Sequence, residues 1–320
     1  MASEFELIER YFSRPAKRAV LGVGDDCALW APAVGMLQAV STDMLVEGRH
    51  FLAGTDPEKL GRKSLAVNLS DLAAMGAEPR HALLAIALPA PDEHWVGAFA
   101  RGLFAMADLH GVELIGGDTT RGPLAISITV IGEVPPALAL RRDAALAGDE
   151  VWLSGATGEA ALALAHQQGR VRIAGRDLQD CLSRLDDPVP RVELGGRLRG
   201  IARAAIDVSD GLLADLGHIA ERSGVGIDVI AGRLPVAGAL GRCADAELRL
   251  ECMAGGGDDY ELAFTAPRDR HADILRLGAD IGLSLTAIGN VVPGEAVVTL
   301  RDAAGAQMKP TRAGFDHFST

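Results

Sequence analysis

The sequence predicts a mixed α/β (α+β) protein of two domains, and three observations support this expectation. The chain has 320 residues, which is enough for two domains of ordinary size, each with its own core. Apolar runs typical of strands alternate with segments whose apolar residues follow helical spacing. An irregular, proline-containing stretch, VPPALALRRDAALAGDE, separates two such alternations. We therefore expect one domain over residues 1–137 and a second over residues 138–320.

The first half is expected to begin with a helix, because the acidic segment MASEFELIERYF has an amphipathic pattern. Pro57 marks the start of a later helix and Gly76 its end. Thr42 and Asp43 are expected just after a strand, and a glycine pair should break another strand before Asp118. The expected elements after the N-terminal helix are a strand at 36–41, helices at 56–76 and 91–110, and strands at 112–117 and 123–134.

The second half repeats the alternation. Ser209 stands directly before a helical pattern, where it is expected to act as the N-cap. A polar stretch follows the first helix of this half. The expected strands are at 151–155, 205–209, 226–231, 260–266 and 296–300, and the expected helices are at 158–168, 210–224 and 268–282.

Composition excludes several classes of protein. A net charge of −12 argues against a nucleic-acid-binding surface, which would need a basic stripe. The N-terminus does not resemble a signal peptide, and no apolar run approaches the roughly 18 residues of a membrane span. The four cysteines form no CxxC pair, so we expect a reduced, cytoplasmic protein, with Cys27 as a small buried residue.

Six short segments place Asp beside Gly, Ser or Thr, next to an apolar element. They are GVGDDCALW, STDMLVEGRHF, NLSDLAAMG, IGGDTTRG, AIDVSDGLLADL and AGGGDDYEL. Each alone could be a surface turn, a helix cap or a solvated helix face. Asp71 is harder to explain in this way, because it lies in a mostly apolar helix with Asn68 one turn earlier, and burying an unpaired carboxylate is costly.

Together the six segments indicate a shared site. Carboxylates with hydroxyl neighbours are the oxygen ligands that Mg²⁺ or Ca²⁺ prefers. Glycines allow the backbone to approach phosphate oxygens, and bound cations could bridge a negative protein to a polyphosphate. The sequence has no GxxxxGK[ST] motif, no GxGxxG motif and no protein-kinase signature, so a protein of this kind would use ATP differently from either class.

With these motifs in order, the chain resembles the thiamine-monophosphate kinase family, within the wider aminoimidazole-ribotide-synthetase-like ATP-binding group. The resemblance is carried by EFELIERYF, GVGDDCAL, STDMLVEGRHF, AVNLSDLAAMGAEP, LIGGDTTRGPL, AIDVSDGLLADLGHI, GGGDDYEL and GFDHF. It covers essentially the whole chain and is weaker near residues 165–185 and 230–250.

The resemblance implies ATP-dependent phosphorylation of thiamine monophosphate to thiamine diphosphate, assisted by several Mg²⁺ ions. Because such an acceptor is already a dianion at neutral pH, we expect direct in-line transfer. It implies a homodimer, in which the N-terminal domain forms the dimer and ATP-binding surface and the C-terminal domain completes the ATP and substrate sites. Neither nucleic acid nor a membrane is implied as a partner.

The resemblance also implies roles for individual residues. Asp258 stands where the family commonly has glutamate, and Phe315 stands where it has an aromatic residue, often tyrosine. The implied metal ligands are Asp26, Ser41, Thr42, Asp43, Asp71, Asp118, Asp207 and Asp210; the ATP contacts are Gly117, Asp118, Arg142 and Ser209; the substrate contacts are His50, Asp258 and Phe315; and the catalytic residues are Asp43, Asp118, Asp210 and Arg142.

Two alternatives remain open from the sequence. One is a related ATP-using enzyme, such as a selenide-activating or purine-synthesis enzyme, which the GRHF and GFDHF segments disfavour. The other is a non-enzymatic, dimeric protein that binds divalent metals, which would bind metal but not ATP.

Overall fold

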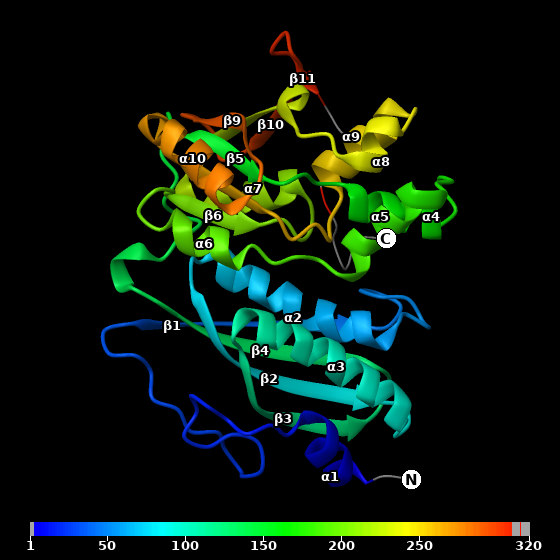
Figure 1. The fold of residues 1–320 in the computed structure, drawn as a ribbon. Coiled ribbons are helices and arrows are strands. Elements are labelled where there is room, and N and C mark those ends of the chain that lie inside the picture. The colour runs from blue at the N-terminus through cyan, green and yellow to red at the C-terminus, as the bar shows by residue number, and fades with distance from the viewer. Residues whose placement is uncertain (1–2, 309–313, 315–320) are drawn as a thin grey trace. The chain divides into compact units, whose positions relative to one another are not determined.

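A computed structural model describes residues 3–308 and residue 314 (Figure 1). The chain forms two compact units. The first comprises Met1–Leu72 and Ala77–Ala137, and the second comprises Ala73–Gly76 and Leu138–Thr320. Each unit is described by itself below. No helix in the described part of the chain is both long enough and apolar enough to cross a membrane.

The chain begins with a short helix, as the amphipathic pattern predicted. Helix α1 (Glu4–Leu7) continues into the π-helical segment η1 (Ile8–Phe12). Ser3 and Glu6 form a capping box, which satisfies backbone N–H groups at the helix start. The ring of Phe12 packs edge-on against Phe99 with 6.4 Å between centroids, which anchors this segment to the first unit.

The first unit is built on a sheet in the order β1-β4-β2-β3, as traced in its described residues. Strand β4 pairs antiparallel with both β1 and β2, whereas β2 and β3 are parallel. The parallel pair requires a crossover, which helix α3 provides. The strands are β1 (Leu37–Val46), β2 (Glu78–Leu88), β3 (Glu113–Arg121) and β4 (Ala125–Val134).

Two helices, α2 (Pro57–Ala74) and α3 (Glu93–His110), lie over one face of this sheet (Figure 1). The helices approach each other closely at two glycines. A Cβ atom added to Gly61 would fall on the carbonyl oxygen of Phe99, and one added to Gly102 would fall on the carbonyl oxygen of Glu58. Both helices were predicted from the sequence, and α2 ends before Gly76, which adopts a φ of 65°.

The strands of this unit are longer and more numerous than the sequence predicted. Strand β1 runs past Asp43 to Val46, and β3 runs through Gly117 and Asp118 to Arg121, so both predicted endpoints were wrong. Strand β2 was not predicted at all. Polar and glycine residues normally mark loops, but here the neighbouring strands β4 and β2 supply the ladder hydrogen bonds that keep the chain extended.

The second unit contains a larger sheet in the order β11-β10-β7-β9-β5-β8-β6, within the described residues. Its strands are β5 (Glu150–Ser154), β6 (Ala204–Asp207), β7 (Gly226–Ile230), β8 (Leu262–Ala266), β9 (Leu285–Val292), β10 (Val298–Arg301) and β11 (Gln307–Met308). Its helices are α4 (Glu159–Gln167), α5 (Gly175–Asp186), α6 (Val192–Leu198), α7 (Leu212–Ser223), α8 (Gly238–Arg242), α9 (Ala246–Gly255) and α10 (His271–Ile281).

This sheet is covered on both faces. Val151 and Leu153 of β5 face a core with residues of α4, α7 and α9, whereas Trp152 between them faces a second core with residues of α6 and α10. Because alternate side chains of a strand point to opposite faces, a run of buried residues indicates a sheet packed on both sides. Of these elements, β9, β11, α5, α6, α8 and α9 were not predicted.

The close contact of α2 and α3 gives the first testable prediction. Gly61→Ala should destabilise the protein by about 1–3 kcal/mol, because the added methyl group overpacks the contact with the backbone of α3. The matched control is Gly217→Ala in α7, where an added Cβ meets nothing within 4 Å. That change should raise stability by about 0.5–1 kcal/mol, the ordinary gain of alanine over glycine in a helix.

Denaturant unfolding of the two variants checks this pair. If Gly61→Ala unfolded at the wild-type midpoint, the helices would not approach as closely as described.

Candidate active site

The first unit brings three of the predicted site residues together beside α2. Ser41 and Asp43 are two positions apart on β1, so both side chains point to the same face of the strand, toward the helix. Ser41 Oγ donates a hydrogen bond to Asp71 Oδ2 at 2.5 Å. The backbone N–H of Asp43 donates to the side-chain carbonyl of Asn68 at 3.0 Å, and Asn68 is fully buried. Asn68 and Asp71 lie one turn apart on α2, so strand and helix form one oxygen-rich patch.

Two other predicted residues of the first unit lie elsewhere. The side chain of Thr42 points to the opposite face of β1, where its hydroxyl lies 2.8 Å from that of Thr129. Asp118 is exposed on β3, at the far edge of the sheet from β1, about 14 Å away at the usual strand spacing. Asp118 pairs with Ala85 on the face away from the helices, so it does not join the patch of Ser41 and Asp71.

Gly117 is required by the fold next to Asp118. Its φ is 147°, and an added Cβ would collide with the backbone of Leu84 on the neighbouring strand. No other residue type fits this close approach. Asp118, the next residue, is exposed on the edge strand of the sheet.

The loop with the two adjacent acids lies before β1. Asp25 and Asp26 are exposed, and Asp25 Oδ1 accepts a hydrogen bond from the N–H of Asp26 at 2.8 Å. Asp25 therefore behaves as an ordinary turn residue. Cys27 is also exposed, so the prediction that it is buried was wrong. Isolated bridges join Leu21 to Leu29 and Val23 to Asp25, and residues 24–27 at the tip of the segment are exposed.

His50 lies in the turn that follows β1. Its Nδ1 atom accepts a hydrogen bond from the backbone N–H of Val46 at 3.0 Å. An accepting Nδ1 carries no proton, so in the neutral ring the N–H is at Nε2. This hydrogen bond holds the ring in one orientation.

The second unit brings three predicted residues together at the end of β6. Asp207 is the buried last residue of that strand, and Ser209 and Asp210 follow it. One oxygen of Asp215, Oδ2, accepts hydrogen bonds from the backbone N–H groups of Ser209, Asp210 and Gly211 at 3.0 to 3.1 Å. Burial raises the pKa of Asp215 to about 7, although these three donors act in the opposite direction.

Asp215 also corrects a prediction from the sequence. Ser209 was expected to cap the following helix, but α7 begins at Leu212, after Gly211, and Ser209 makes no capping bond. The N–H groups ahead of the helix are instead satisfied by Asp215, which reaches back from the first turn of α7. The sequence carries no distinct signal for this role, because an acid in the first turn of a helix is common.

A second loop lies against this turn. The N–H of Asp258 donates to the carbonyl of Ser209 at 2.9 Å, and the N–H of Tyr260 donates to the carbonyl of Val208 at 2.8 Å. An added Cβ at Gly257 would collide with the carbonyl of Ser209, so glycine is needed there. The structure thus joins Asp258 to Asp207, Ser209 and Asp210 through backbone hydrogen bonds.

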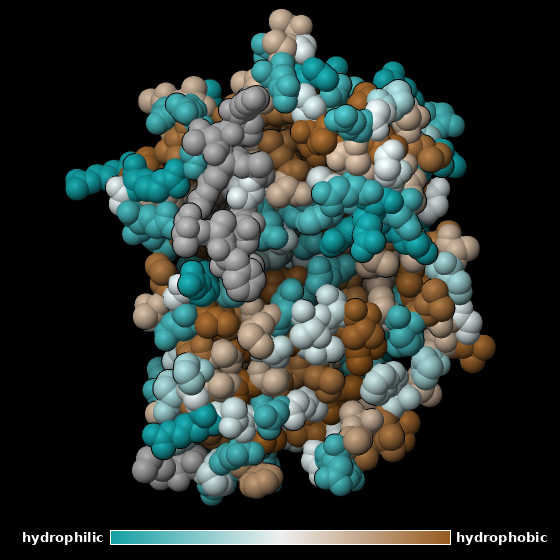
Figure 2. Space-filling model, turned by 180° about the vertical axis from the view of Figure 1, so that it is seen from behind, coloured by the Kyte–Doolittle hydropathy of each residue, from teal (hydrophilic) through white to brown (hydrophobic). Residues whose placement is uncertain are grey.

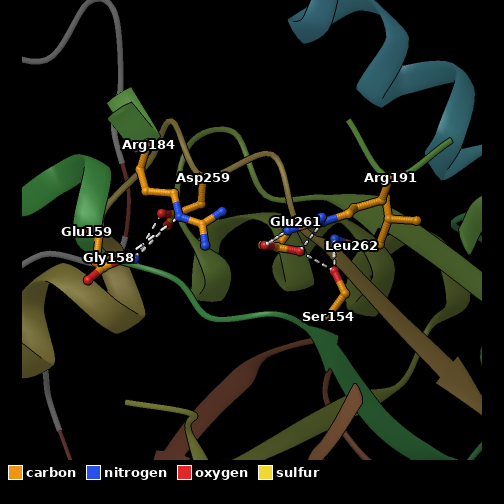
Figure 3. A network of polar contacts seen from close by, with 8 residues as sticks. All are labelled: Ser154, Gly158, Glu159, Arg184, Arg191, Asp259, Glu261 and Leu262. Atoms are coloured by element: carbon orange, nitrogen blue, oxygen red, sulfur yellow. Dashed lines mark hydrogen bonds and ion pairs between the residues drawn. The ribbon is translucent and has the colours of Figure 1, made fainter. Parts of the chain in front are cut away.

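A buried ion pair at the end of this loop was missed by sequence reasoning (Figure 3). Glu261 is 2% exposed and accepts from Arg191 through both carboxylate oxygens, with Arg191 Nε at 2.6 Å from Oε2. Ser154 Oγ donates to the same carboxylate at 2.5 Å and accepts the N–H of Leu262 at 2.9 Å. The network links β5, the start of α6 and β8.

Two predicted residues remain. Arg142 is exposed in the segment before β5, where its carbonyl accepts a hydrogen bond from Ser223 Oγ at 2.8 Å. Phe315 lies outside the described residues. Among the described residues, no group of three or more His, Cys, Asp or Glu side chains is placed to hold a metal ion by itself.

Comparisons with known proteins bear on this arrangement. Residues 24–134 match the family described as AIR synthase related protein, N-terminal domain. The chain is 43% identical to the thiamine-monophosphate kinase of Escherichia coli (strain K12), over 99% of this chain and 98% of that protein.

Solved structures agree with the sequence comparisons. The thiamine-monophosphate kinase from Stenotrophomonas maltophilia K279a superposes with a TM-score of 0.84 at 46% identity, covering 92% of this chain and 94% of that one. AaThiL complexed with AMPPCP and TMP superposes with a TM-score of 0.78 at 30% identity, covering 90% and 89%.

These likenesses confirm the expected mixed α/β class and aminoimidazole-ribotide-synthetase-like architecture. They also extend over nearly the full length of the chain and of the relatives. The chain therefore belongs to the thiamine-monophosphate kinase family.

Proposed function

We propose that this protein transfers the γ-phosphoryl group of ATP to thiamine monophosphate, producing thiamine diphosphate and ADP. The observation that carries the proposal is the full-length likeness to thiamine-monophosphate kinases, one of which is a structure complexed with AMPPCP and TMP. The enzyme is then a phosphotransferase whose acceptor is a phosphate group. The oxygen-rich patches of the two units support this reading, because they suit a reaction between polyanions.

The acceptor needs little chemical activation. The second pKa of a phosphate monoester is about 6, so thiamine monophosphate is largely a dianion at neutral pH. Its oxygen can attack without a general base. His50, whose Nε2 carries the proton in the neutral ring, is therefore suited to bind the acceptor rather than to deprotonate it.

The oxygen donors within each unit suit Mg²⁺ ions. Magnesium is usually held by one or two carboxylates, together with water and substrate phosphates. The residues that would hold Mg²⁺ ions through hard oxygen atoms are Asp26, Ser41, Thr42, Asp43, Asp71, Asp118, Asp207 and Asp210. Bound Mg²⁺ would neutralise the charge of the polyphosphate.

The remaining contacts place and stabilise ATP. Gly117 and Asp118 are exposed on the edge strand β3, and Ser209 lies in the turn held by Asp215. Arg142 is exposed and supplies a fixed positive charge for the moving phosphoryl group. With these groups we propose direct in-line transfer, in which Asp43, Asp118, Asp210 and Arg142 act on the reacting phosphates and no phosphoenzyme forms.

The organic end of the acceptor carries a cationic ring. A carboxylate and an aromatic face are its natural partners, and we assign these roles to Asp258 and Phe315.

We also propose that the enzyme is a cytoplasmic homodimer, formed by the first unit. Apolar residues lie among polar ones on the side of the molecule seen in Figure 2. On the face of the sheet that lacks helices, β1 exposes apolar side chains, including Val40 at 63% and Met44 at 58% exposure. Such a patch is unusual on a monomer and typical of an interface. The cysteines are all free, as expected in a reducing compartment.

Sedimentation equilibrium tests the dimer. A monomer mass would contradict it.

The central experiment measures ADP release from ATP with and without thiamine monophosphate. Release should depend on the acceptor, vanish when EDTA removes divalent metal and return when Mg²⁺ is added. Rapid ADP release in metal-free buffer, or ADP release at the same rate without thiamine monophosphate, would contradict the proposal.

Replacing one site carboxylate tests the patch beside α2. Asp43→Asn keeps the backbone bond to Asn68 but removes the charge, so kcat should fall at least about 100-fold with little change in stability. The matched control is Asp108→Asn on α3, whose side chain is exposed in a surface ion pair with Arg14. The control should keep wild-type kinetics. Near-normal turnover by Asp43→Asn would remove Asp43 from the catalytic set.

A further inference from the structure

The loop that carries Asp258 has an unusual backbone. Among the described residues other than glycine, only Asp258 and Tyr260 have positive φ angles, of 66° and 50°. This left-handed conformation costs roughly 1 kcal/mol or more for a residue with a side chain. Two such residues within three positions require firm support from their surroundings, and strain of this kind concentrates at functional sites.

The support comes from both ends of the loop. On one side, the N–H groups of Asp258 and Tyr260 bond to the turn after β6, as described above. On the other side, the carbonyl of Glu261 accepts the N–H of Val208 at 2.8 Å, and the Glu261 carboxylate is held by Arg191 and Ser154 (Figure 3). The backbone between these anchors has little freedom, so the direction of its side chains is preset.

The strained backbone brings two side chains of the loop together. Tyr260 Oη donates a hydrogen bond to Asp258 Oδ1 at 3.2 Å, although the residues are only two positions apart. The neighbouring acid, Asp259, is separated from this pair, because both its oxygens lie 2.9 Å from the N–H of Gly158 at the start of α4. The two adjacent acids thus have different partners. Asp259 accepts the N–H of Gly158 at the start of α4, and Asp258 accepts the hydroxyl of Tyr260.

We propose that Tyr260 is a positioning residue for the phosphate acceptor: its hydroxyl fixes the Asp258 carboxylate in the orientation that meets the cationic ring. The inference rests on the proposed function and deepens it. Tyr260 acts only through Asp258. Because the loop is anchored by Glu261, the carboxylate is oriented before the acceptor binds, which reduces the entropy lost on binding.

The test is a comparison of two tyrosine variants, since the chain contains only two tyrosines. Tyr260→Phe removes the hydroxyl and should raise KM for thiamine monophosphate about 3- to 10-fold, the scale of a partly solvated hydrogen bond to a charged group. The values of kcat and of KM for ATP should stay within about twofold of wild type. Tyr11→Phe is the matched control, because Tyr11 Oη donates to Glu93 at 3.1 Å in the first unit; all its constants should stay at wild type.

A double-mutant cycle separates positioning from a general structural role. Asp258→Gly removes the carboxylate and tolerates the positive φ, and it should raise KM for the acceptor. Adding Tyr260→Phe to Asp258→Gly should then raise KM no further. Asp258→Asn, which keeps an oxygen for Tyr260 and tolerates the same backbone, should raise KM without lowering the melting temperature.

The outcomes are distinct. If Tyr260→Phe leaves KM unchanged while Asp258→Gly raises it, or if the two effects simply multiply, Tyr260 does not position Asp258. If Asp258→Gly also leaves KM unchanged, the inference fails together with the assignment of Asp258 to the acceptor. If the wild-type enzyme releases no ADP in response to thiamine monophosphate, the proposed function itself fails.

Discussion

Three consecutive backbone N–H groups, those of Ser209, Asp210 and Gly211, donate to a single oxygen of Asp215. Much of the second unit's site depends on this arrangement. The bonds hold the chain in a turn between β6 and α7, and the turn presents the carbonyl of Ser209 to the N–H of Asp258. A buried carboxylate is costly by itself, and the three donors aimed at one oxygen offset part of that cost and fix the turn.

The same physical rule separates structural acids from candidate site acids throughout the molecule. Glu113 accepts backbone N–H groups of Lys17, Arg18 and Ala19, and Glu133 accepts from Ala33 and Arg80. These carboxylates tie segments of the chain to the sheet, and in both cases the donors lower the carboxyl pKa despite burial. Asp118 and Asp210, by contrast, stand at the edges of elements, on backbone that glycines or Asp215 hold in place.

Sequence reasoning succeeded where local chemistry decides the structure. Pro57 and Gly76 bracket α2, and the acid-rich motifs identified the segments that form the patches of the two units. It failed where distant partners decide. Strand β2 has an alanine- and leucine-rich sequence that could equally be helical, and only pairing with β3 and β4 makes it a strand. Likewise, the motifs did not show that Asp215 and Glu261 are buried acids that hold neighbouring groups in place, whereas Asp210 and Asp258 are candidate ligand contacts. That difference depends on burial, which results from tertiary packing and cannot be read from a short motif.

The central claim is that these patches serve a transfer of phosphate onto a phosphate. Phosphorus NMR of a reaction mixture containing ATP, Mg²⁺ and thiamine monophosphate tests it most directly. The account predicts that the single resonance of the monophosphate ester is replaced by the two coupled resonances of a diphosphate ester, in step with the conversion of ATP to ADP. Formation of ADP and inorganic phosphate, with the monophosphate ester unchanged, would contradict it.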